Sequence, residues 1–435
     1  MGYGGAINIG DWVNSGSCPT VTINNSTIAD NTNYGWIGDD DAAVYIQSGT
    51  VIINNSILYN NYFASTLGYD IDGTSTTNYC IYRSTYNVTH NNTVGTSDPL
   101  FTDAANDDYT LQSTSPAIDE GHADYAPATD INGLSRPQGV KDDLGCYELQ
   151  INTWQGGTTG NETVWSNAGN WSTGVVPAST ENVIIANVTH DPVIDGNDQV
   201  GSLTIQSGGV LTINSSVTLT ASSVELQSGG DIVISNGELN CTGKFDHDGD
   251  LTMSGSGVLD IDGEYESSAS ATEIISGGTI EVAGEWDGAN DDEFTPTGGT
   301  VTMNNSSDKN LAQHANSNFY NLTIANSGGD VDVTAALDID GDLTINASAD
   351  LDIGGGNANI ELSGSFTNNG TFTTSGETIT FDGAAGDKTS SAISDATLDI
   401  VVDKTSAGKV TFAGTCSFDE VTITNGILAI TSNTM

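Results

Sequence analysis

Four short acidic clusters have the residue types and spacing that could bind a metal ion. Each cluster combines carboxylates at alternate positions with a glycine. The four clusters are DIDG (Asp70–Gly73), DHDGD (Asp246–Asp250), DIDGE (Asp260–Glu264) and DIDGD (Asp338–Asp342). Alternate side chains of a strand point to the same face, and glycine lets the chain turn so that a third oxygen can join them. This arrangement suits calcium, which takes about six to eight oxygen ligands.

The candidate calcium ligands are the aspartates of the last three clusters: Asp246, Asp248, Asp250, Asp260, Asp262, Asp338, Asp340 and Asp342. None of the clusters continues into the full calcium loop with its terminal bidentate glutamate. A structural explanation gives the same pattern, because outward aspartates that alternate with inward Ile or Leu would meet a glycine at each corner of the chain. Ca²⁺ is the only cofactor that the sequence suggests, and both interpretations remain open.

Basic residues and histidines form no catalytic pattern. Residues 1–150 contain three basic side chains, and of these Arg83 is the only candidate for a base that could cleave an acidic polysaccharide. We expect Arg136 to form a structural ion pair. The five histidines are scattered, without the spacing of a triad or of a metal site: His90, His122, His190, His247 and His314. The sequence therefore predicts a protein that is not an enzyme.

The chain is strongly acidic throughout its 435 residues. It has 57 acidic and 8 basic side chains and a formal net charge of -49. Nucleic acid is therefore excluded as a partner, since phosphate binding needs clustered Lys and Arg. No apolar run approaches the roughly 18 residues of a membrane-spanning helix. Salt or divalent cations would screen the self-repulsion of such a surface, which favours an extracellular location.

The repeated unit of the second half is typified by Leu203–Ile213 (LTIQSGGVLTI), two short strands joined by a Ser-Gly-Gly corner. Apolar and polar residues alternate, as in a half-buried strand. So short a unit cannot bury its apolar face alone, which is typical of a solenoid. Glycine pairs recur along this half of the chain, and we expect each to form the same corner of a coil of about 21 to 30 residues. The pairs are Gly208–Gly209, Gly229–Gly230, Gly277–Gly278, Gly298–Gly299 and Gly328–Gly329.

A different repeat occupies the first hundred residues. The segment TVTINNSTIADN (Thr20–Asn31) is echoed 30 residues later by TVIINNSILYNN (Thr50–Asn61), and a looser copy spans Arg83–Asn92. In stacked coils the shared Asn residues would lie above one another and form amide ladders. The five cysteines are far apart and form no CxxC pair, so we expect them to be small buried residues: Cys18, Cys80, Cys146, Cys241 and Cys416.

Motifs after residue 97 resemble a known family. The succession DPLF (Asp98–Phe101), DYTLQSTSPAID (Asp108–Asp119), DINGLSRPQG (Asp130–Gly139) and LGCYE (Leu144–Glu148) is similar to the closing part of right-handed parallel β-helix, pectate-lyase-like domains of bacterial surface and secreted proteins. Cys146 stands where that family usually has a small residue such as Ala. The resemblance implies a β-helix over residues 1–150 and a structural end without transferable catalytic residues.

A second resemblance begins at residue 152. Trp154, Trp165, Trp171 and Pro177, and later FYNLTI (Phe319–Ile324), are similar to β-solenoid modules of Bacteroidetes surface proteins. This resemblance implies export by the type IX secretion route and a role in adhesion. The tryptophans could form a cap that shields the first coil from water, or an exposed platform on which sugars stack.

Together these observations predict an all-β chain: a right-handed parallel β-helix (1–150), a Trp-rich cap and junction (151–200), and a second β-solenoid (201–435) that we expect to continue beyond this fragment of a giant protein. Tandem β-sandwiches are the alternative for residues 151–435. The expected function is a structural rod in a secreted or surface-displayed adhesin. Its expected partners are cell-surface or secretion-machinery proteins and glycans, and the alternative is a carbohydrate-binding or polysaccharide-cleaving module.

Overall fold

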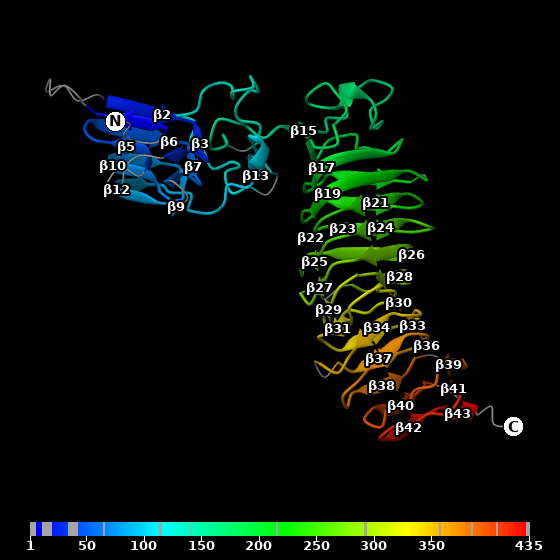
Figure 1. Cartoon of the computed structure of the whole chain (residues 1–435). Helices are drawn as coiled ribbons and strands as arrows, with labels where there is room; N and C mark the ends of the chain where they lie inside the picture. Colours follow the sequence, from blue (N-terminus) through cyan, green and yellow to red (C-terminus); the bar gives the residue numbers. More distant parts are fainter. Residues whose placement is uncertain are drawn as a thin grey trace. The chain divides into compact units, whose positions relative to one another are not determined.

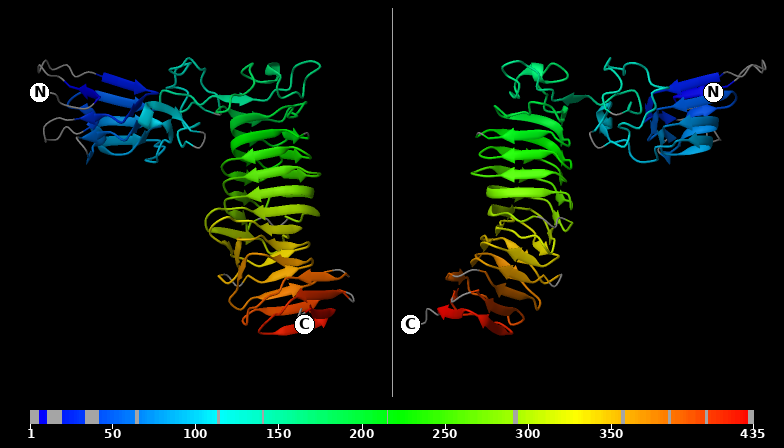
Figure 2. Two further views of the ribbon diagram at one scale, coloured as in Figure 1. Left: turned by 45° about the vertical axis from the view of Figure 1, so that its right-hand side comes forward. Right: turned by 180° about the vertical axis from the view of Figure 1, so that it is seen from behind.

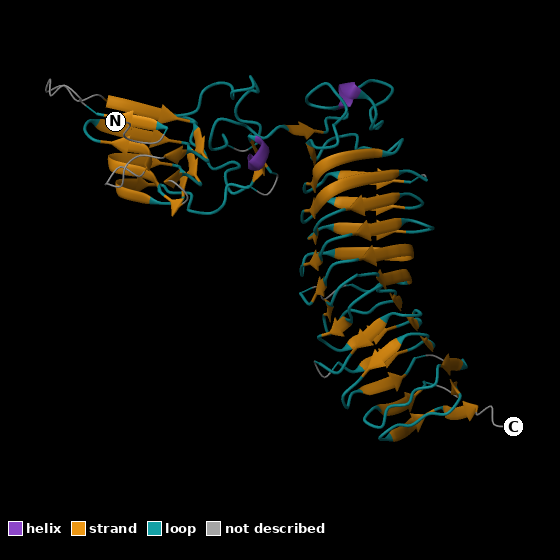
Figure 3. Cartoon of the chain, in the orientation of Figure 1, coloured by secondary structure: helices purple, strands orange, loops and turns teal. Residues whose placement is uncertain are grey.

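The computed structural model describes residues 6–10, 20–33, 42–63, 66–112, 115–139, 141–214, 216–290, 294–355, 358–383, 386–405 and 408–431. The chain divides into two compact units, Met1–Ile151 and Asn152–Met435. Strands dominate both units, and the helices within the described ranges are two short 3₁₀ turns, η1 (Ala104–Asn106) and η2 (Ala168–Asn170) (Figure 3). In that part of the chain no helix is long and apolar enough to cross a membrane.

Parallel stacking of short strands builds both units, which confirms the predicted all-β solenoid (Figure 1). The strand partners are successive turns of the chain, for example Val21 with Val51 in the first unit and Leu203 with Val224 in the second. The alternative of tandem β-sandwiches over residues 151–435 is wrong, because sandwiches are antiparallel and the ladders here are parallel. Each unit is described by itself below.

The first unit stacks its coils in two main sheets, ordered β1-β5-β10-β6-β2 with β12 on β10, and β11-β7-β3. The predicted 30-residue repeat is confirmed, because Thr20–Asn24 pairs in register with Thr50–Asn54. The strands of this unit are β1 (Ile7–Ile9), β2 (Thr20–Asn24), β3 (Thr27–Ala29), β4 (Thr32–Asn33), β5 (Ala42–Ile46), β6 (Thr50–Asn54), β7 (Ile57–Tyr59), β8 (Tyr62–Phe63), β9 (Thr66–Leu67), β10 (Tyr69–Asn78), β11 (Ile81–Tyr82), β12 (Thr85–Asn91), β13 (Phe101–Asp103) and β14 (Asp108–Leu111).

The predicted amide ladder runs along this stack. Asn54 Nδ2 donates to Asn24 Oδ1 at 2.8 Å, Asn78 Nδ2 to Asn54 Oδ1 at 2.7 Å, and Asn91 Nδ2 to Asn78 Oδ1 at 3.2 Å. Asn91 lies in β12, so the looser copy Arg83–Asn92 supplies the fourth asparagine and the third rung of the ladder. The ladder ties four levels of the coil together through side chains as well as through the backbone.

The closing segment, residues 98–148, packs along the side of this stack. Leu111, Ala117 and Leu144 are buried against Ile57 and Ile81 of the coil. It also bonds to two successive coils, since Asn25 Nδ2 donates to the Asp143 carbonyl (3.2 Å) and the Gly145 amide donates to the Asn55 carbonyl (2.8 Å). The predicted structural ion pair of Arg136 is confirmed: its Nη1 lies 2.7 Å from Oε2 of Glu148, and both side chains are buried.

The second unit is a solenoid with three faces, and most turns contribute a short strand or bridge to each of them. Figure 2 shows the stacked turns from two sides. We name them face A, which contains Leu203–Ile205, face B, which contains Val210–Ile213, and face C, which contains Leu219–Ala221. Inward and outward residues alternate along the strands, as in β21 and β24. This is the pattern that the repeat in the sequence predicted.

Face A is built from β16 (Asn182–Ile185), β17 (Asp198–Ile205), β19 (Thr218–Leu226), β22 (Phe245–His247), β25 (Tyr265–Ser267), β27 (Trp286–Gly288), β29 (Lys309–Gln313), β31 (Val331–Val333), β34 (Asp350–Asp352) and β37 (Thr371–Thr373). Face B is built from β18 (Val210–Ile213), β20 (Asp231–Ile234), β23 (Asp250–Met253), β26 (Thr272–Val282), β32 (Leu337–Ile339), β35 (Ile360–Leu362), β38 (Thr378–Phe381), β40 (Asp399–Asp403) and β42 (Val421–Asn425). Face C takes the first parts of β17 and β19, the last part of β26, and β21 (Glu238–Cys241), β24 (Val258–Ile261), β28 (Gly298–Met303), β30 (Asn321–Ile324), β33 (Leu343–Ile345), β36 (Phe366–Asn368), β39 (Lys388–Ser390), β41 (Lys409–Ala413) and β43 (Ile427–Thr431). The short strand β15 (Ile151–Thr153) precedes β16.

One hydrophobic core runs through this unit from Trp154 to Phe412. On face C the buried positions follow one another at steps of 20 or 21 residues in the regular part of the stack, at Leu219, Leu239, Leu259, Ile280, Val301, Leu322 and Leu343. The coil is therefore at the short end of the predicted range. Two cysteines, Cys80 and Cys241, are buried as expected; Cys146 and Cys416 are partly exposed, and Cys18 lies outside the described residues.

The prediction of one repeated Gly-Gly corner is wrong. Gly208–Gly209 and Gly229–Gly230 join face A to face B, whereas Gly277–Gly278 and Gly298–Gly299 join face B to face C, and Gly328–Gly329 joins face C to face A. All five pairs contain one glycine with positive φ. Any corner that needs this conformation favours glycine, so the pairs mark corners in general and not the phase of the coil.

Candidate functional site

The three tryptophans at the start of the second unit form a buried cap. Trp154, Trp165 and Trp171 are at most 2% exposed, and Trp171 lies edge-on to both others, with ring centroids 5.0 and 4.6 Å away. Each indole N–H donates a hydrogen bond: to the carbonyl of His190 (2.7 Å), to Oδ2 of Asp198 (2.6 Å) and to the carbonyl of Trp165 (2.9 Å), respectively. Such buried rings shield the first turn, and they offer no platform on which a sugar could stack.

The structure separates the predicted calcium ligands onto different faces and corners. Asp246 lies on face A, with Asp248 and Asp250 after it toward face B. Asp260 lies on face C with Asp262 at the corner that follows, and Asp338 lies on face B with Asp340 and Asp342 toward face C. Within the described residues, none of these eight belongs to a set of three carboxylates close enough to share one ion. The alternation with buried residues such as Leu259 and Ile339 agrees with the structural explanation of the pattern.

The remaining acidic cluster, Asp70–Gly73 in the first unit, binds backbone amides. Asp70 is buried, and its carboxylate accepts hydrogen bonds from Asn61 Nδ2 (2.7 Å) and from the amides of Arg83 (2.7 Å) and Ser84 (3.0 Å). Burial raises the pKa of Asp70 although these hydrogen bonds oppose the shift. Arg83, the only candidate base of that segment, donates to Asn60 Oδ1 at 3.3 Å on the surface.

Outward carboxylates form a column on face A. The parallel register places Glu225, Asp246 and Glu266 on three successive turns. Lys244 is the cation beside them, with Nζ 3.6 Å from Asp246 Oδ2 and paired with Glu266. Desolvation lowers the pKa of Lys244, but the hydrogen bond to Glu266 and the neighbouring carboxylates outweigh it, so the pKa is raised.

A carboxylate cluster that the sequence interpretation missed lies further along face A. Asp330, Asp332 and Asp352 offer carboxylate oxygens that all lie within 4.8 Å of one another, a spacing at which they could hold one cation. The pKa of Asp332 is raised by desolvation and by the charges of Asp352 and Asp308. The register pairs Asp332 with Asp352. The signal in the sequence is two DxD-like segments one coil length apart, and it predicts this pairing only when the phase of the coil is known.

A buried polar set is the second feature that the sequence interpretation missed. His247 Nδ1 lies 3.0 Å from the hydroxyl of Tyr265 and 3.1 Å from Oε1 of Glu273, and the side chains of His247 and Glu273 are both fully buried. Within the described residues His247 Nε2 and Ser267 Oγ have no hydrogen-bond partner. Glu273 occupies an inward position, because the register aligns it with the buried Leu251.

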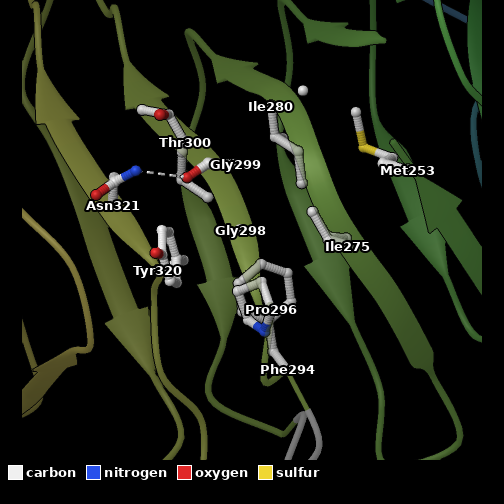
Figure 4. Close-up of a pocket in the computed structure, with 12 residues that line it drawn as sticks. Met253, Ile275, Ile280, Phe294, Pro296, Gly298, Gly299, Thr300, Tyr320 and Asn321 are labelled. Carbon is white, nitrogen blue, oxygen red and sulfur yellow. Dashed lines mark hydrogen bonds between the residues drawn. The ribbon is translucent and has the colours of Figure 1, made fainter. Parts of the chain in front are cut away.

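An apolar pocket opens where the turn after β26 becomes irregular (Figure 4). Its wall includes Met253, Ile275, Phe294 and Pro296, beside Asn321, whose Nδ2 donates to the carbonyl of Gly299 at 3.0 Å. The cavity volume is about 10 Å³. That is room for one water molecule, so this pocket is a packing defect of the solenoid and not a ligand site.

Comparisons with known proteins give one partial match. No curated protein and no solved structure is significantly similar to the chain. The Trp cap and the first turns of the second unit, residues 153–273, are similar to a domain of unknown function, DUF8693.

Proposed function

We propose that this chain is a structural rod segment of a large secreted or surface-displayed bacterial protein of the adhesin type. The observation that carries the proposal is the continuous core of the second unit, in which each turn buries its apolar face against the turns before and after it. In such a solenoid the added turns increase length without changing the cross-section.

The dimensions of the stack support this role. Ten intervals separate Leu219 from Ile430 along face C, the last four running from Leu343 through Phe366, Ser390 and Phe412. At the usual strand spacing of about 4.8 Å they span about 48 Å. Rigid parallel stacking over this distance suits a spacer that holds other parts of a protein away from a surface.

The charge supports an extracellular location at the bacterial cell surface. The carboxylates within an outward column, such as Glu225, Asp246 and Glu266, repel one another. Extracellular salt and divalent cations screen this repulsion. Together with the resemblance to Bacteroidetes surface modules, this favours export by the type IX route and contacts with cell-surface or secretion-machinery proteins.

A deletion of one complete turn tests the rod. Removal of residues 219–238 joins Thr218 to Leu239, which occupies the same register position as Leu219. We expect the shortened chain to fold, and scattering or electron microscopy to show a second unit shorter by about 4.8 Å. Loss of folding would contradict independent, stackable turns.

Labelling of intact cells tests the location. An antibody against the full chain should bind producing cells without permeabilisation, and external protease should remove the epitope. A signal that appears only after the cells are opened would overturn the surface assignment, whatever the outcome of the turn deletion.

A further inference from the structure

A recess of about 510 Å³ lies on the cap of the second unit. Its walls are the loop after β15 and the loop after β16, which contribute Gln155, Thr159 and Glu162 on one side and Val188 and His190 on the other. The recess is open to solvent, with Gln155, Thr159 and His190 exposed, and its volume falls in the range of small-molecule sites, about 300 to 1,000 Å³. All of the recess lies within the segment that is similar to DUF8693.

The first loop is held in place from within. Asn170 is fully buried; its Oδ1 accepts from the amide of Thr158 (2.9 Å), and its Nδ2 donates to the carbonyls of Asn161 (2.7 Å) and Val164 (3.0 Å). One side chain thus fixes three points of the loop, and a ligand need not order the loop on binding.

The two loops also contact each other beneath the recess. Trp154 Nε1 donates to the carbonyl of His190 at 2.7 Å, and a Cβ on Gly156, whose φ is +56°, would lie 2.2 Å from that same oxygen. Only glycine allows this approach. The indole of Trp154 therefore ties the two loops together through Gly156 and His190, which both line the recess.

The recess presents free hydrogen-bonding groups around an apolar side chain. Across the described part of the chain, no hydrogen bond from the protein reaches the side chains of Gln155, Thr159 or His190. The amide of Gly160 donates to Glu162 Oε1 at 2.8 Å. This hydrogen bond, with that of the Glu162 amide, lowers the pKa of Glu162, so the carboxylate is ionised at neutral pH. Val188, half-buried against the core, adds a hydrocarbon surface.

We propose that this recess binds a neutral saccharide unit. A carboxylate, an amide, a hydroxyl and an imidazole complement the alternating donors and acceptors of sugar hydroxyls, and Val188 and the backbone glycines can meet the C–H face of the ring. The fixed negative charge of Glu162 in a chain of net charge -49 disfavours uronates, sulfated sugars and phosphates. The proposal does not depend on the rod function.

Ligand titration of the full chain tests the proposal. Maltose, cellobiose, lactose and N,N′-diacetylchitobiose are titrated by saturation-transfer NMR and calorimetry. We expect at least one to bind with a Kd of about 0.1 to 10 mM, as suits a small ligand with few anchoring groups. Glu162→Gln should weaken that binding about tenfold, because hydrogen bonds to a charged acceptor are stronger than those to a neutral one. Gln155→Ala should also weaken it.

Glu225→Gln is the matched control, since it removes the same charge from face A, outside the recess. The affinity of Glu225→Gln for the sugar should equal that of the wild type. Glu162→Gln, Gln155→Ala and Glu225→Gln should all keep the wild-type melting temperature. The proposal is overturned if no sugar of the panel binds at about 20 mM, or if Glu162→Gln and Glu225→Gln bind the sugar equally. Binding of lysine amide or glucuronate in place of the neutral sugars would also overturn it.

Discussion

The most unusual residues of the interior are His247 and Glu273, whose Nδ1 and Oε1 atoms lie 3.1 Å apart inside the core. The residues one turn earlier in the same inward positions are apolar, Leu226 on face A and Leu251 on face B, whereas Ser267 follows His247 one turn later. Removing one partner of a buried pair leaves the other without compensation, whereas replacing both by apolar residues is often neutral or stabilising.

We therefore expect His247→Leu alone to lower the free energy of unfolding by about 3 to 5 kcal/mol, since it leaves the Glu273 carboxylate buried and unpaired. The double variant His247→Leu/Glu273→Leu should be at least as stable as the wild type. Denaturant midpoints measure both effects. A double variant that is clearly less stable than the wild type would contradict this expectation, and a loss equal to the sum of the two single losses would show that the two side chains are not coupled.

Asp338 gives a pH prediction. Desolvation, with the charges of Asp340, Glu361 and Asp382, raises its pKa to about 6. A raised pKa means that the folded state binds the proton more tightly than the unfolded state. The stability that the protonated form contributes is complete below the unfolded value of about 3.9 and is lost as the pH rises through about 6.

Protonation of Asp338 should therefore raise the stability of the wild type when the pH is lowered from 7.5 to 5. Asp338→Asn should remove the contribution of this group to the pH dependence of stability. Asp395 is the control, because hydrogen bonds from the Thr374 hydroxyl and from Thr397 lower its pKa. It is ionised at both pH values, so Asp395→Asn should leave the pH response of the wild type unchanged. Melting temperatures of the wild type and of both variants at the two pH values measure these responses. Equal pH responses of wild type and Asp338→Asn would contradict the assignment.

Calcium remains a prediction, and Asp330, Asp332 and Asp352 are where the structure lets it be tested. If the ion binds the folded chain there, adding it at about 100 times its Kd would stabilise by about 2.7 kcal/mol. Asp332→Asn should reduce the rise in melting temperature, and Asp246→Asn, on the column beside Lys244, should leave it unchanged. An unchanged melting temperature after EDTA treatment would remove calcium from the account.

At the scale of the elements, the amide ladder of the first unit is open to a direct test. Asn54 is buried and bonds both to Asn24 and to Asn78, whereas Asn91 makes the last, exposed rung. Asn54→Ala breaks two rungs at a buried position, so we expect a loss of about 1 to 3 kcal/mol. Asn91→Ala should cost much less. Hydrogen exchange of β2 and β6 would show the difference, and equal effects would contradict a ladder role.

The strands and the ladder could be predicted because their signals are local or exactly spaced: period-two alternation, and the identical residues of Thr20–Asn31 and Thr50–Asn61, which fix their own register. The phase of the second solenoid could not. Glycine pairs fit all its corners, and without that phase neither Glu273 nor the pairing of Asp332 with Asp352 can be assigned. The side chains that line the recess, such as Gln155 and Glu162, could not be grouped from the sequence either, since two separate loops build the recess.

At the scale of the whole molecule, the last described turn carries an unusual surface. Ile423 and Ile430 are each 51% exposed and continue inward columns that are buried one turn earlier, at Val402 and Phe412. An exposed apolar strand edge promotes association. We expect the isolated chain to self-associate, and Ile423→Lys/Ile430→Lys to reduce light scattering. Ile274→Lys, at a 64% exposed position away from this turn, is the control and should not.

The parallel stack also determines how the second unit responds to tension. The hydrogen bonds between turns lie along its long axis, and each turn holds mainly its neighbours. Pulling on the ends therefore opens the bonds of one turn at a time, and each released turn of about 20 residues lengthens the chain by about 65 Å. A stack of this design yields in many small steps and absorbs work in each of them, so a sudden load at one end would be damped before it reached the other end.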